Sequence, residues 1–318
     1  MSKRVNTLPE LPAEEHPYFL LPERTLRLEK TGPGGTGTGD GGPVTEVSTR
    51  EIGDGGPVLL LPGLWTSALS FRGLLQPLSQ KHRALLPEWY DPERQDPSAV
   101  SNTAALSDLA LGLIRALSLN RPLLVGHAEA GLAGLHLALS HPEALGGLVV
   151  LGASLGPTFL AHWRWWWRAR SGPSARWAKR SFQHPFRAAM EMLDYADPAV
   201  LSRQEIRHLA QGWSTLPAAR ARSRVLARTQ VREFFAPLDA ILQEATAAGR
   251  PFPIPLTLVY GQEDPKAPPE HGQRLNQTFP GSELLVAEGC RGAVHVERPE
   301  WCARVIVSAA ERCLSSCC

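Results

Sequence analysis

The feature that most constrains this 318-residue chain is an apolar run followed at once by a helical pattern. Residues 123–126 read Leu-Leu-Val-Gly, a run that favours a buried strand. Within a few residues begins a leucine spacing typical of a helix, which continues from Leu132 to Leu139 and stops before Pro142. So short a passage from strand to helix predicts a sharp corner that lifts the side chain at position 128 above the edge of a parallel sheet.

The corner itself, residues 126–131, reads Gly-His-Ala-Glu-Ala-Gly. This sequence resembles the nucleophile elbow of the α/β-hydrolase family, whose common version is Gly-His-Ser-x-Gly-Gly. The resemblance places Ala128 where the family carries its nucleophile. Because a methyl group cannot attack a carbonyl carbon, the motif that identifies the fold argues against the family's usual chemistry.

Composition narrows the class of protein. With 43% hydrophobic and 20% charged residues, the chain is an ordinary globular protein, and a net charge of +2 is too small to favour nucleic acid as the main partner. We find no signal peptide and no apolar stretch long enough for a membrane span. The cysteines are odd in number and lack metal-ligand spacing, so we predict a cytoplasmic protein with no metal and no cofactor.

The order of strand and helix patterns predicts an α/β protein. Together with this pattern, the resemblance implies the α/β-hydrolase fold: a mostly parallel sheet with helices on both faces and a helical cap insertion. We divide the chain into an N-terminal arm at residues 1–23, a core at 24–158 and 251–312, a cap at 159–250 and a C-terminal tail at 313–318. Strands are expected near residues 25–29, 44–52, 57–63, 82–89, 123–126, 148–151, 254–260 and 284–286, and the last two helices near 269–278 and 299–312.

Two further segments resemble the family's catalytic motifs. Residues 261–265 read Gly-Gln-Glu-Asp-Pro, and the family's Gly-x-x-Asp-Pro assigns the catalytic acid to Asp264. Residues 289–300 align without a gap with the family's late segment, which puts Gly292 at the place of the catalytic histidine. In that frame His295 matches a second histidine that many relatives carry. The resemblance thus implies a degenerate triad that retains only its acid.

The backbone of the corner does not depend on these side chains. The resemblance implies that the N–H groups of Leu64 and Glu129 form the oxyanion hole and converge on an anion or a carbonyl oxygen. Trp65 and His127 are predicted to line the pocket, with His127 packing beneath the corner. The Glu129 carboxylate either caps the helix or serves as an alternative acid or base.

The predicted cap begins with an unusual aromatic and basic run. Two interpretations stay open: a helix that packs tryptophans over the pocket, or a patch that binds a membrane surface. The C-terminal Cys317 and Cys318 are interpreted as a frayed end rather than a lipidated one. The residues of the run are Trp163, Arg164, Trp165, Trp166, Trp167 and Arg168.

Three functional hypotheses follow. The first is a non-catalytic homologue, a pseudoenzyme, that binds a small apolar or carbonyl-containing ligand, senses it, or acts as a scaffold. The second is an atypical hydrolase or lyase in which Glu129, Asp264 or His295 activates water or moves a proton. The third is a membrane-peripheral or protein-interaction module that uses the Trp/Arg run.

Overall fold

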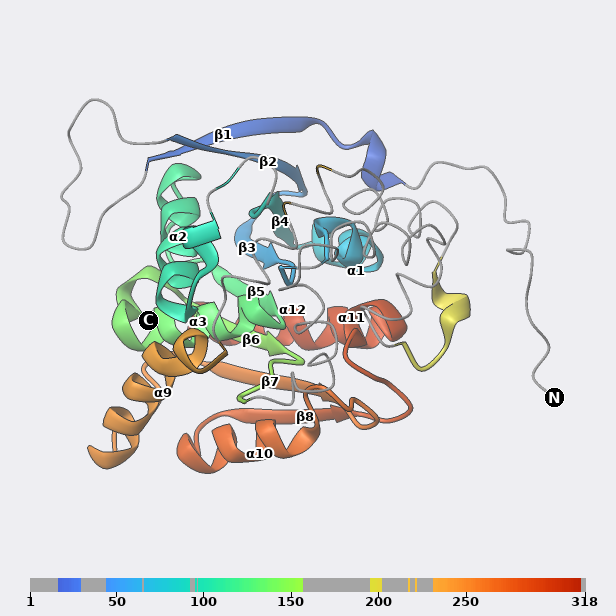
Figure 1. Cartoon of the computed structure of the whole chain (residues 1–318). Coiled ribbons are helices and arrows are strands. Elements are labelled where there is room, and N and C mark those ends of the chain that lie inside the picture. The colour runs from blue at the N-terminus through green and yellow to red at the C-terminus, as the bar shows by residue number, and fades with distance from the viewer. Residues whose placement is uncertain are drawn as a thin grey trace.

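The chain folds around one eight-stranded sheet, which Figure 1 shows running from β1 at one edge to β8 at the other. The computed structural model describes residues 17–29, 44–64, 66–91, 95, 97–156, 195–201, 217, 221 and 231–315. The spatial order of the strands is β1-β2-β4-β3-β5-β6-β7-β8. The strands are β1 (Glu23–Glu29), β2 (Val44–Ile52), β3 (Gly56–Leu61), β4 (His82–Glu88), β5 (Leu123–His127), β6 (Gly147–Leu151), β7 (Leu256–Gly261) and β8 (Glu283–Ala287).

Strand direction divides the sheet into two parts. β2 pairs antiparallel with both β1 and β4, whereas every pairing from β4 through β3, β5, β6 and β7 to β8 is parallel. Parallel strands end at the same edge, so β3, β5 and β7 bring their carboxyl ends together. This edge receives the loop that contains Leu64, the corner at Ala128 and the turn at Asp264.

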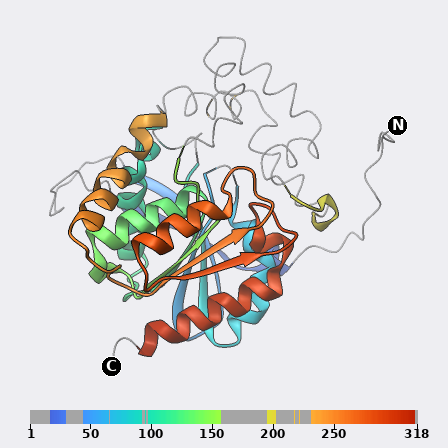
Figure 2. The ribbon, with the colours of Figure 1, turned by 90° about the horizontal axis from the view of Figure 1, so that it is seen from below.

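Helices cover both faces of the sheet. Side chains of α2, α3, α9 and α10 join one buried cluster and those of α1 and α12 join another, an arrangement that Figures 1 and 2 display from two sides. A 3₁₀ helix, Pro17–Leu20, precedes β1. The helices are α1 (Arg72–Ser79), α2 (Thr103–Ala116), α3 (Glu129–Ser140), α9 (Val231–Ala247), α10 (Pro269–Thr278), α11 (Val294–Glu297) and α12 (Pro299–Ser315), with 3₁₀ helices at Pro17–Leu20, Ala68–Phe71, Pro97–Val100, Pro142–Ala144 and Pro198–Val200.

The inner strands explain why both faces need cover. In β3 the side chains of Leu59 and Leu61 enter one cluster and those of Val58 and Leu60 the other, and all four are fully buried. A continuous apolar strand of this kind is stable only between two layers of helices. The predicted mostly parallel sheet with helices on both faces is therefore confirmed.

Part of the predicted domain division falls on described residues. Helix α9, which lies within the range assigned to the cap, packs Phe234 and Leu238 into the cluster shared with α2 and α3. The backbone N–H of Leu238 also donates to Thr103 Oγ1 of α2 at 3.1 Å. Helix α12 continues to Ser315, into the range assigned to the tail. Residues 1–16 of the arm, Cys317, Cys318 and most of the cap, including the Trp/Arg run 163–168, lie outside the described residues.

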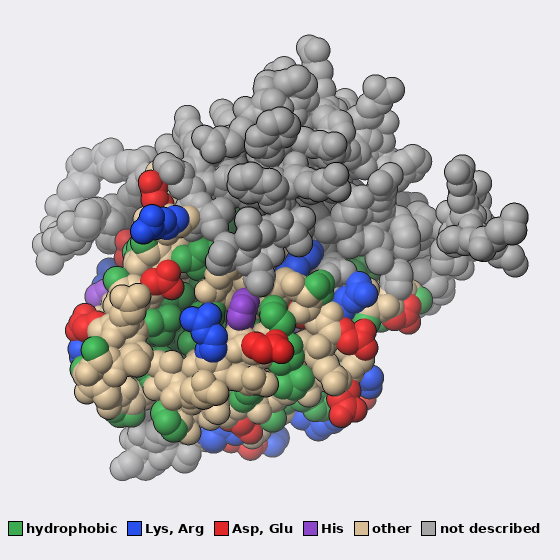
Figure 3. Space-filling view, turned by 60° about the horizontal axis from the view of Figure 1, so that its bottom comes forward, with side chains coloured by type: hydrophobic (Ala, Val, Ile, Leu, Met, Phe, Trp, Pro, Cys, Tyr) green, Lys and Arg blue, Asp and Glu red, His purple; other side chains and the backbone are tan. Residues whose placement is uncertain are grey.

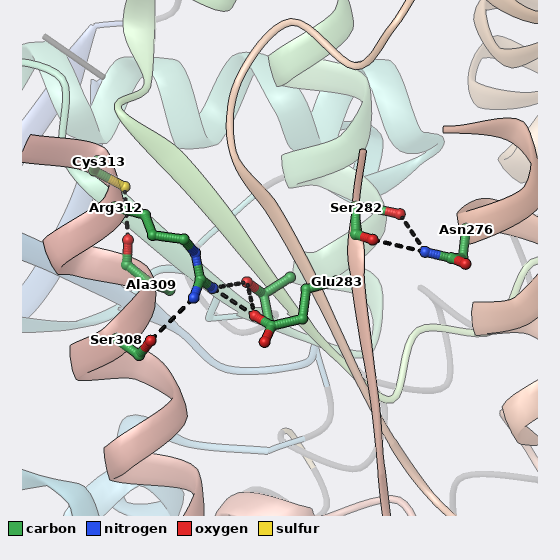
Figure 4. A network of polar contacts seen from close by, with 8 residues as sticks. Asn276, Ser282, Glu283, Ser308, Ala309, Arg312 and Cys313 are labelled. Atoms are coloured by element: carbon green, nitrogen blue, oxygen red, sulfur yellow. Dashed lines mark hydrogen bonds and ion pairs between the residues drawn. The ribbon is translucent and has the colours of Figure 1, made fainter. Parts of the chain in front are cut away.

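Polar contacts attach the last helix to the edge of the sheet (Figure 4). Arg312 of α12 donates to Glu283 Oε2 of β8 at 2.6 Å and to Thr257 Oγ1 of β7 at 2.8 Å. On the same helix it also donates to Ser308 Oγ at 3.0 Å. One guanidinium thus connects the helix with two strands. Over the coloured part of the face in Figure 3, acidic and basic side chains are interspersed.

Candidate functional site

The strand–turn–helix corner predicted from the sequence is present at Ala128. This residue adopts φ 51° and ψ −117° between the end of β5 and the start of α3. A positive φ is unusual for a residue with a side chain. The turn is held by the Ala128 N–H, which donates to Leu151 O at 2.9 Å, and by its carbonyl, which accepts from the Gly131 N–H at 3.0 Å.

Two glycines make this corner sterically feasible. A Cβ atom on Gly126 would lie 2.5 Å from Ala130 O, and one on Gly131 would lie 2.9 Å from Val150 Cγ1. Both distances are below normal contact, so neither position accepts a side chain without a shift of its neighbours. The second glycine of the corner is therefore Gly131, and Ala130 fits where the family's common sequence has a glycine.

The carboxylate of Glu129 occupies the point on which two backbone N–H groups converge. Its Oε2 atom accepts from the Leu64 N–H at 3.2 Å, and the carboxylate also accepts from the N–H of Glu129 itself. A Cβ atom on Gly63 would lie 3.1 Å from Oε2 and 3.2 Å from Ala128 Cβ, so the loop after β3 passes directly over the carboxylate. The two donors predicted to face a ligand's oxygen thus face an oxygen of this chain.

Opposing effects act on this carboxyl group. Burial raises the pKa of Glu129 above its ordinary value, while the two backbone hydrogen bonds and the positive charge of Lys266 partly offset the rise. Lys266 also contributes to lowering the pKa of His127. Sequence reasoning missed Lys266. Its only signal in the sequence is its place two residues after Asp264, in the turn that follows β7.

Asp264 and Gly292 lie against each other. Asp264 is only 3% exposed, and its Oδ1 accepts from the Lys266 backbone N–H at 2.8 Å. A Cβ atom built on Gly292 would lie 3.0 Å from Asp264 Oδ2. A side chain at position 292 would therefore start beside the carboxylate, where the alignment places the histidine. Gly292 itself has no side chain.

His295 and His127 form a buried aromatic contact beneath the corner. The His295 ring, 1% exposed, lies 4.7 Å from the Phe71 ring and 4.6 Å from that of His127. His127 Nε2 donates to the carbonyl oxygen of Gly292 at 3.2 Å. Burial lowers the pKa of His127 to about 4 and that of His295 well below its usual range. Both rings are neutral near pH 7, and within the described residues neither nitrogen of His295 has a hydrogen-bond partner.

Metal binding and membrane insertion can be judged for the described residues. Among them, no group of three or more His, Cys, Asp or Glu side chains is placed to hold a metal ion. None of the helices in those ranges is long and apolar enough to cross a membrane. Trp65, the other residue predicted to line the pocket, lies outside the described residues.

Comparisons with known proteins agree with the fold. Residues 58–305 match the model of a family described as the alpha/beta hydrolase family. A putative carbamate hydrolase RutD from Caulobacter sp. (strain K31) is 37% identical over 116 residues, which cover 35% of this chain and 39% of that protein. The chain thus aligns with less than half the length of the curated relatives matched first.

Longer matches are more distant in sequence. The 2-hydroxy-6-oxo-2,4-heptadienoate hydrolase of Pseudomonas putida is 25% identical over 262 residues, covering 80% of this chain and 88% of that protein. Among solved structures, a thermophilic esterase from Thermogutta terrifontis superposes with a TM-score of 0.65 at 20% identity, over 91% of this chain and 99% of that one. The epoxide hydrolase CorEH gives a TM-score of 0.65 at 15% identity, over 83% and 94%.

Proposed function

Because the chain belongs to the alpha/beta hydrolase family, we propose that it is a non-catalytic member, which binds a small molecule at the corner after β5 instead of cleaving it. The observation that carries this proposal is Ala128: the backbone keeps the strained turn of the corner, while the side chain that would attack a substrate is a methyl group. The fold alone does not decide function, since one fold serves many activities.

The surrounding residues support the proposal. Gly292 offers no imidazole to Asp264, and the neutral His295 is buried between two other rings. Neither arrangement provides a base that is held by an acid, as nucleophilic catalysis in this manner requires. Binding requires neither a nucleophile nor such a base, since shape and a few placed polar groups can hold a small ligand. The ligand that we propose is small, and is apolar or contains a carbonyl group.

The test of this function compares ester hydrolysis and fluorophosphonate labelling in the parent protein and in an Ala128→Ser/Gly292→His variant. We expect no labelling and no hydrolysis above background in the parent, because it lacks a nucleophile at position 128. Labelling of the variant supports a corner whose backbone still positions a serine. Ester hydrolysis by the purified parent overturns the proposal.

The second candidate is an atypical hydrolase or lyase, and one observation favours it. The Glu129 carboxyl lies at the corner, its pKa is raised by burial and a lysine charge acts on it, which suits a group that moves protons. If the parent is active, Glu129→Gln should abolish turnover and His295→Asn should spare it. Loss of activity in both variants would contradict a role for Glu129 alone among Glu129, Asp264 and His295.

Two further expectations remain proposals. A membrane-surface or protein-interaction role depends on the Trp/Arg run, which lies outside the described residues. A cytoplasmic location suits the free thiols of Cys290, Cys302 and Cys313, since a reducing compartment maintains buried thiols in this form.

A further inference from the structure

The contact between Glu129 and the loop after β3 differs from ordinary capping of a helix. A glutamate in the first turn of a helix is stabilised by the helix dipole wherever its carboxylate points. Here the carboxylate is directed at a second element: Leu64, which donates to Oε2, is 65 residues away in the chain. The helix N–H of Glu129 supplies the other donor. The N–H groups of Leu64, in a loop, and of Glu129, in a helix, thus both donate to this carboxylate.

A pair of this kind binds any oxygen that carries negative charge. Donors preorganised around one point stabilise an oxyanion because they need no rearrangement when the charge arrives. The Glu129 carboxylate presents the same chemical group from within the chain. An external carboxylate or phosphate would therefore have to displace it, against the repulsion between two negative charges.

We propose that Glu129 is the specificity-determining residue of this site: its carboxylate is the resident occupant of the Leu64 and Glu129 N–H pair, so the site rejects anionic ligands and selects a ligand with a cationic N–H donor, such as a primary ammonium. This inference rests on the proposed binding function and narrows it. The ligand bonds to the remaining lone pairs of the Glu129 carboxylate, and a carbonyl group of the ligand lies away from the two N–H groups.

Packing around the carboxylate supports a fixed position. Gly63 passes so close that an added Cβ atom would lie 3.1 Å from Oε2, and His127 Nδ1 would lie 3.4 Å from the same Cβ. Among the described residues, Lys266 after β7 places its positive charge near this carboxylate, and His127 at the end of β5 lies beside the same point of the Gly63 backbone. His127 is neutral above its pKa of about 4. Burial raises the pKa of the Glu129 carboxyl, and the two backbone hydrogen bonds and the Lys266 charge partly offset this rise in favour of the ionised form.

The occupancy itself is tested by the amide resonances of Leu64 and Glu129 in the isotope-labelled full chain. As the pH rises above the ordinary pKa of a glutamate, both amide protons should shift along one common titration curve, because loss of the carboxyl proton strengthens both hydrogen bonds. Glu129→Gln should remove this titration and leave the one from His127. Independent curves at the two amides, or a titration unchanged in Glu129→Gln, would overturn the proposal.

The selectivity is tested with butyrate and butylammonium as probes. Butylammonium should shift the Leu64 resonance of the parent and bind at least about tenfold more weakly to Glu129→Gln, which keeps the size of the side chain and removes its charge. Butyrate should bind Glu129→Ala at least about tenfold more tightly than the parent. Glu270→Ala serves as the matched control, since Glu270 is an exposed glutamate in the first turn of α10.

These outcomes separate the inference from the function on which it rests. Parent protein that binds butyrate as well as Glu129→Ala does, or that fails to bind butylammonium at tens of millimolar, contradicts the selectivity. Ester hydrolysis by the parent contradicts the non-catalytic function and leaves the amide titration unaffected. In the Ala128→Ser/Gly292→His background, adding Glu129→Ala should raise the rate of fluorophosphonate labelling about tenfold, and an unchanged rate contradicts the inference.

Discussion

At the scale of the residue, Ala128 carries backbone strain that its side chain does not explain. A non-glycine residue in so sparsely populated a conformation as φ 51°, ψ −117° is destabilised by about 1–3 kcal/mol. The surrounding structure maintains the conformation, through the hydrogen bond to Leu151 and the tight packing of Gly126 and Gly131. Nothing in a methyl group requires the strain.

Ala128→Gly should therefore stabilise the protein. Glycine relieves the strain, while its greater freedom in the unfolded chain removes about 0.5–1 kcal/mol of the gain, which leaves a net increase of about 1 kcal/mol in the free energy of unfolding. Urea denaturation measures this. The matched control is Ala240→Gly at an exposed position within α9, which should lose about 1 kcal/mol. A loss of stability in both variants would show that Ala128 is unstrained.

The sequence predicts the backbone of the site better than its side chains. Gly126, Asp264 and Gly292 follow from short motifs in chain order, because close packing and strand ends dictate where such residues stand. The direction of the Glu129 carboxylate is different, since it depends on Leu64, which comes from a distant loop. The influence of Lys266 likewise arises only when the turn after β7 is brought to the corner.

At the scale of the element, the attachment of α12 depends on one arginine as well as on apolar packing. Arg312 connects the helix with Glu283 on β8, as Figure 4 shows, and it also donates to Thr257 on β7. Thr257 is 2% exposed, whereas the side chains of Arg312 and Glu283 are 40% and 44% exposed. Solvent therefore screens the ion pair between Arg312 and Glu283. The hydrogen bond from Arg312 to the buried Thr257 hydroxyl contributes more to stability than this ion pair does.

Arg312→Ala should lower the free energy of unfolding by about 1 kcal/mol, because the buried Thr257 hydroxyl loses a donor and the ion pair is screened. Arg304→Ala, at an exposed position of the same helix, should change stability by less than about 0.5 kcal/mol. Chemical denaturation of both variants at two salt concentrations measures the difference. Equal effects of the two substitutions would mean that Arg312 contributes only its charge.

Elements with a strong period agree with the structure closely. The strand at Val44–Ile52 and the helix at Pro269–Thr278 have the predicted bounds. Helix α11, Val294–Glu297, was not foreseen because four residues are too few to display a helical period. Helix α9 has a clear period, but its sequence does not reveal that its apolar face packs on α2 and α3.

At the scale of the whole molecule, stability should depend on pH through Glu88 at the end of β4. Its carboxylate accepts from the Ala68 N–H at 3.0 Å and from the Tyr18 hydroxyl at 3.3 Å, and so connects the first 3₁₀ helix and the one before α1 with the sheet. Burial nevertheless raises the pKa of Glu88 to about 7. The folded state thus binds this proton more tightly than the unfolded state, in which a carboxyl titrates near its ordinary value.

The contribution of Glu88 to the free energy of unfolding should therefore be highest below about pH 4.5. It should fall as the pH rises to about 7 and then level off. The total change is on the order of 3 kcal/mol. Glu88→Gln should flatten this part of the profile, since the amide keeps an acceptor and carries no proton equilibrium. Glu46→Gln, an exposed carboxylate on β2, is the control. Urea midpoints across this range measure the profiles, and parallel curves for parent and Glu88→Gln would refute the assignment.

The steric closure of the corner has a consequence for how such a chain changes over generations. At positions 126 and 131 a side chain would force its neighbours to shift, so a replacement there threatens folding and is removed by selection whether or not the protein has an activity. Position 128 already carries a Cβ atom, and a Cβ atom on Gly292 would meet only the Asp264 side chain, at 3.0 Å. Neutral drift can therefore introduce or remove reactive groups there while the scaffold persists, and two replacements suffice to place a serine and a histidine at these positions.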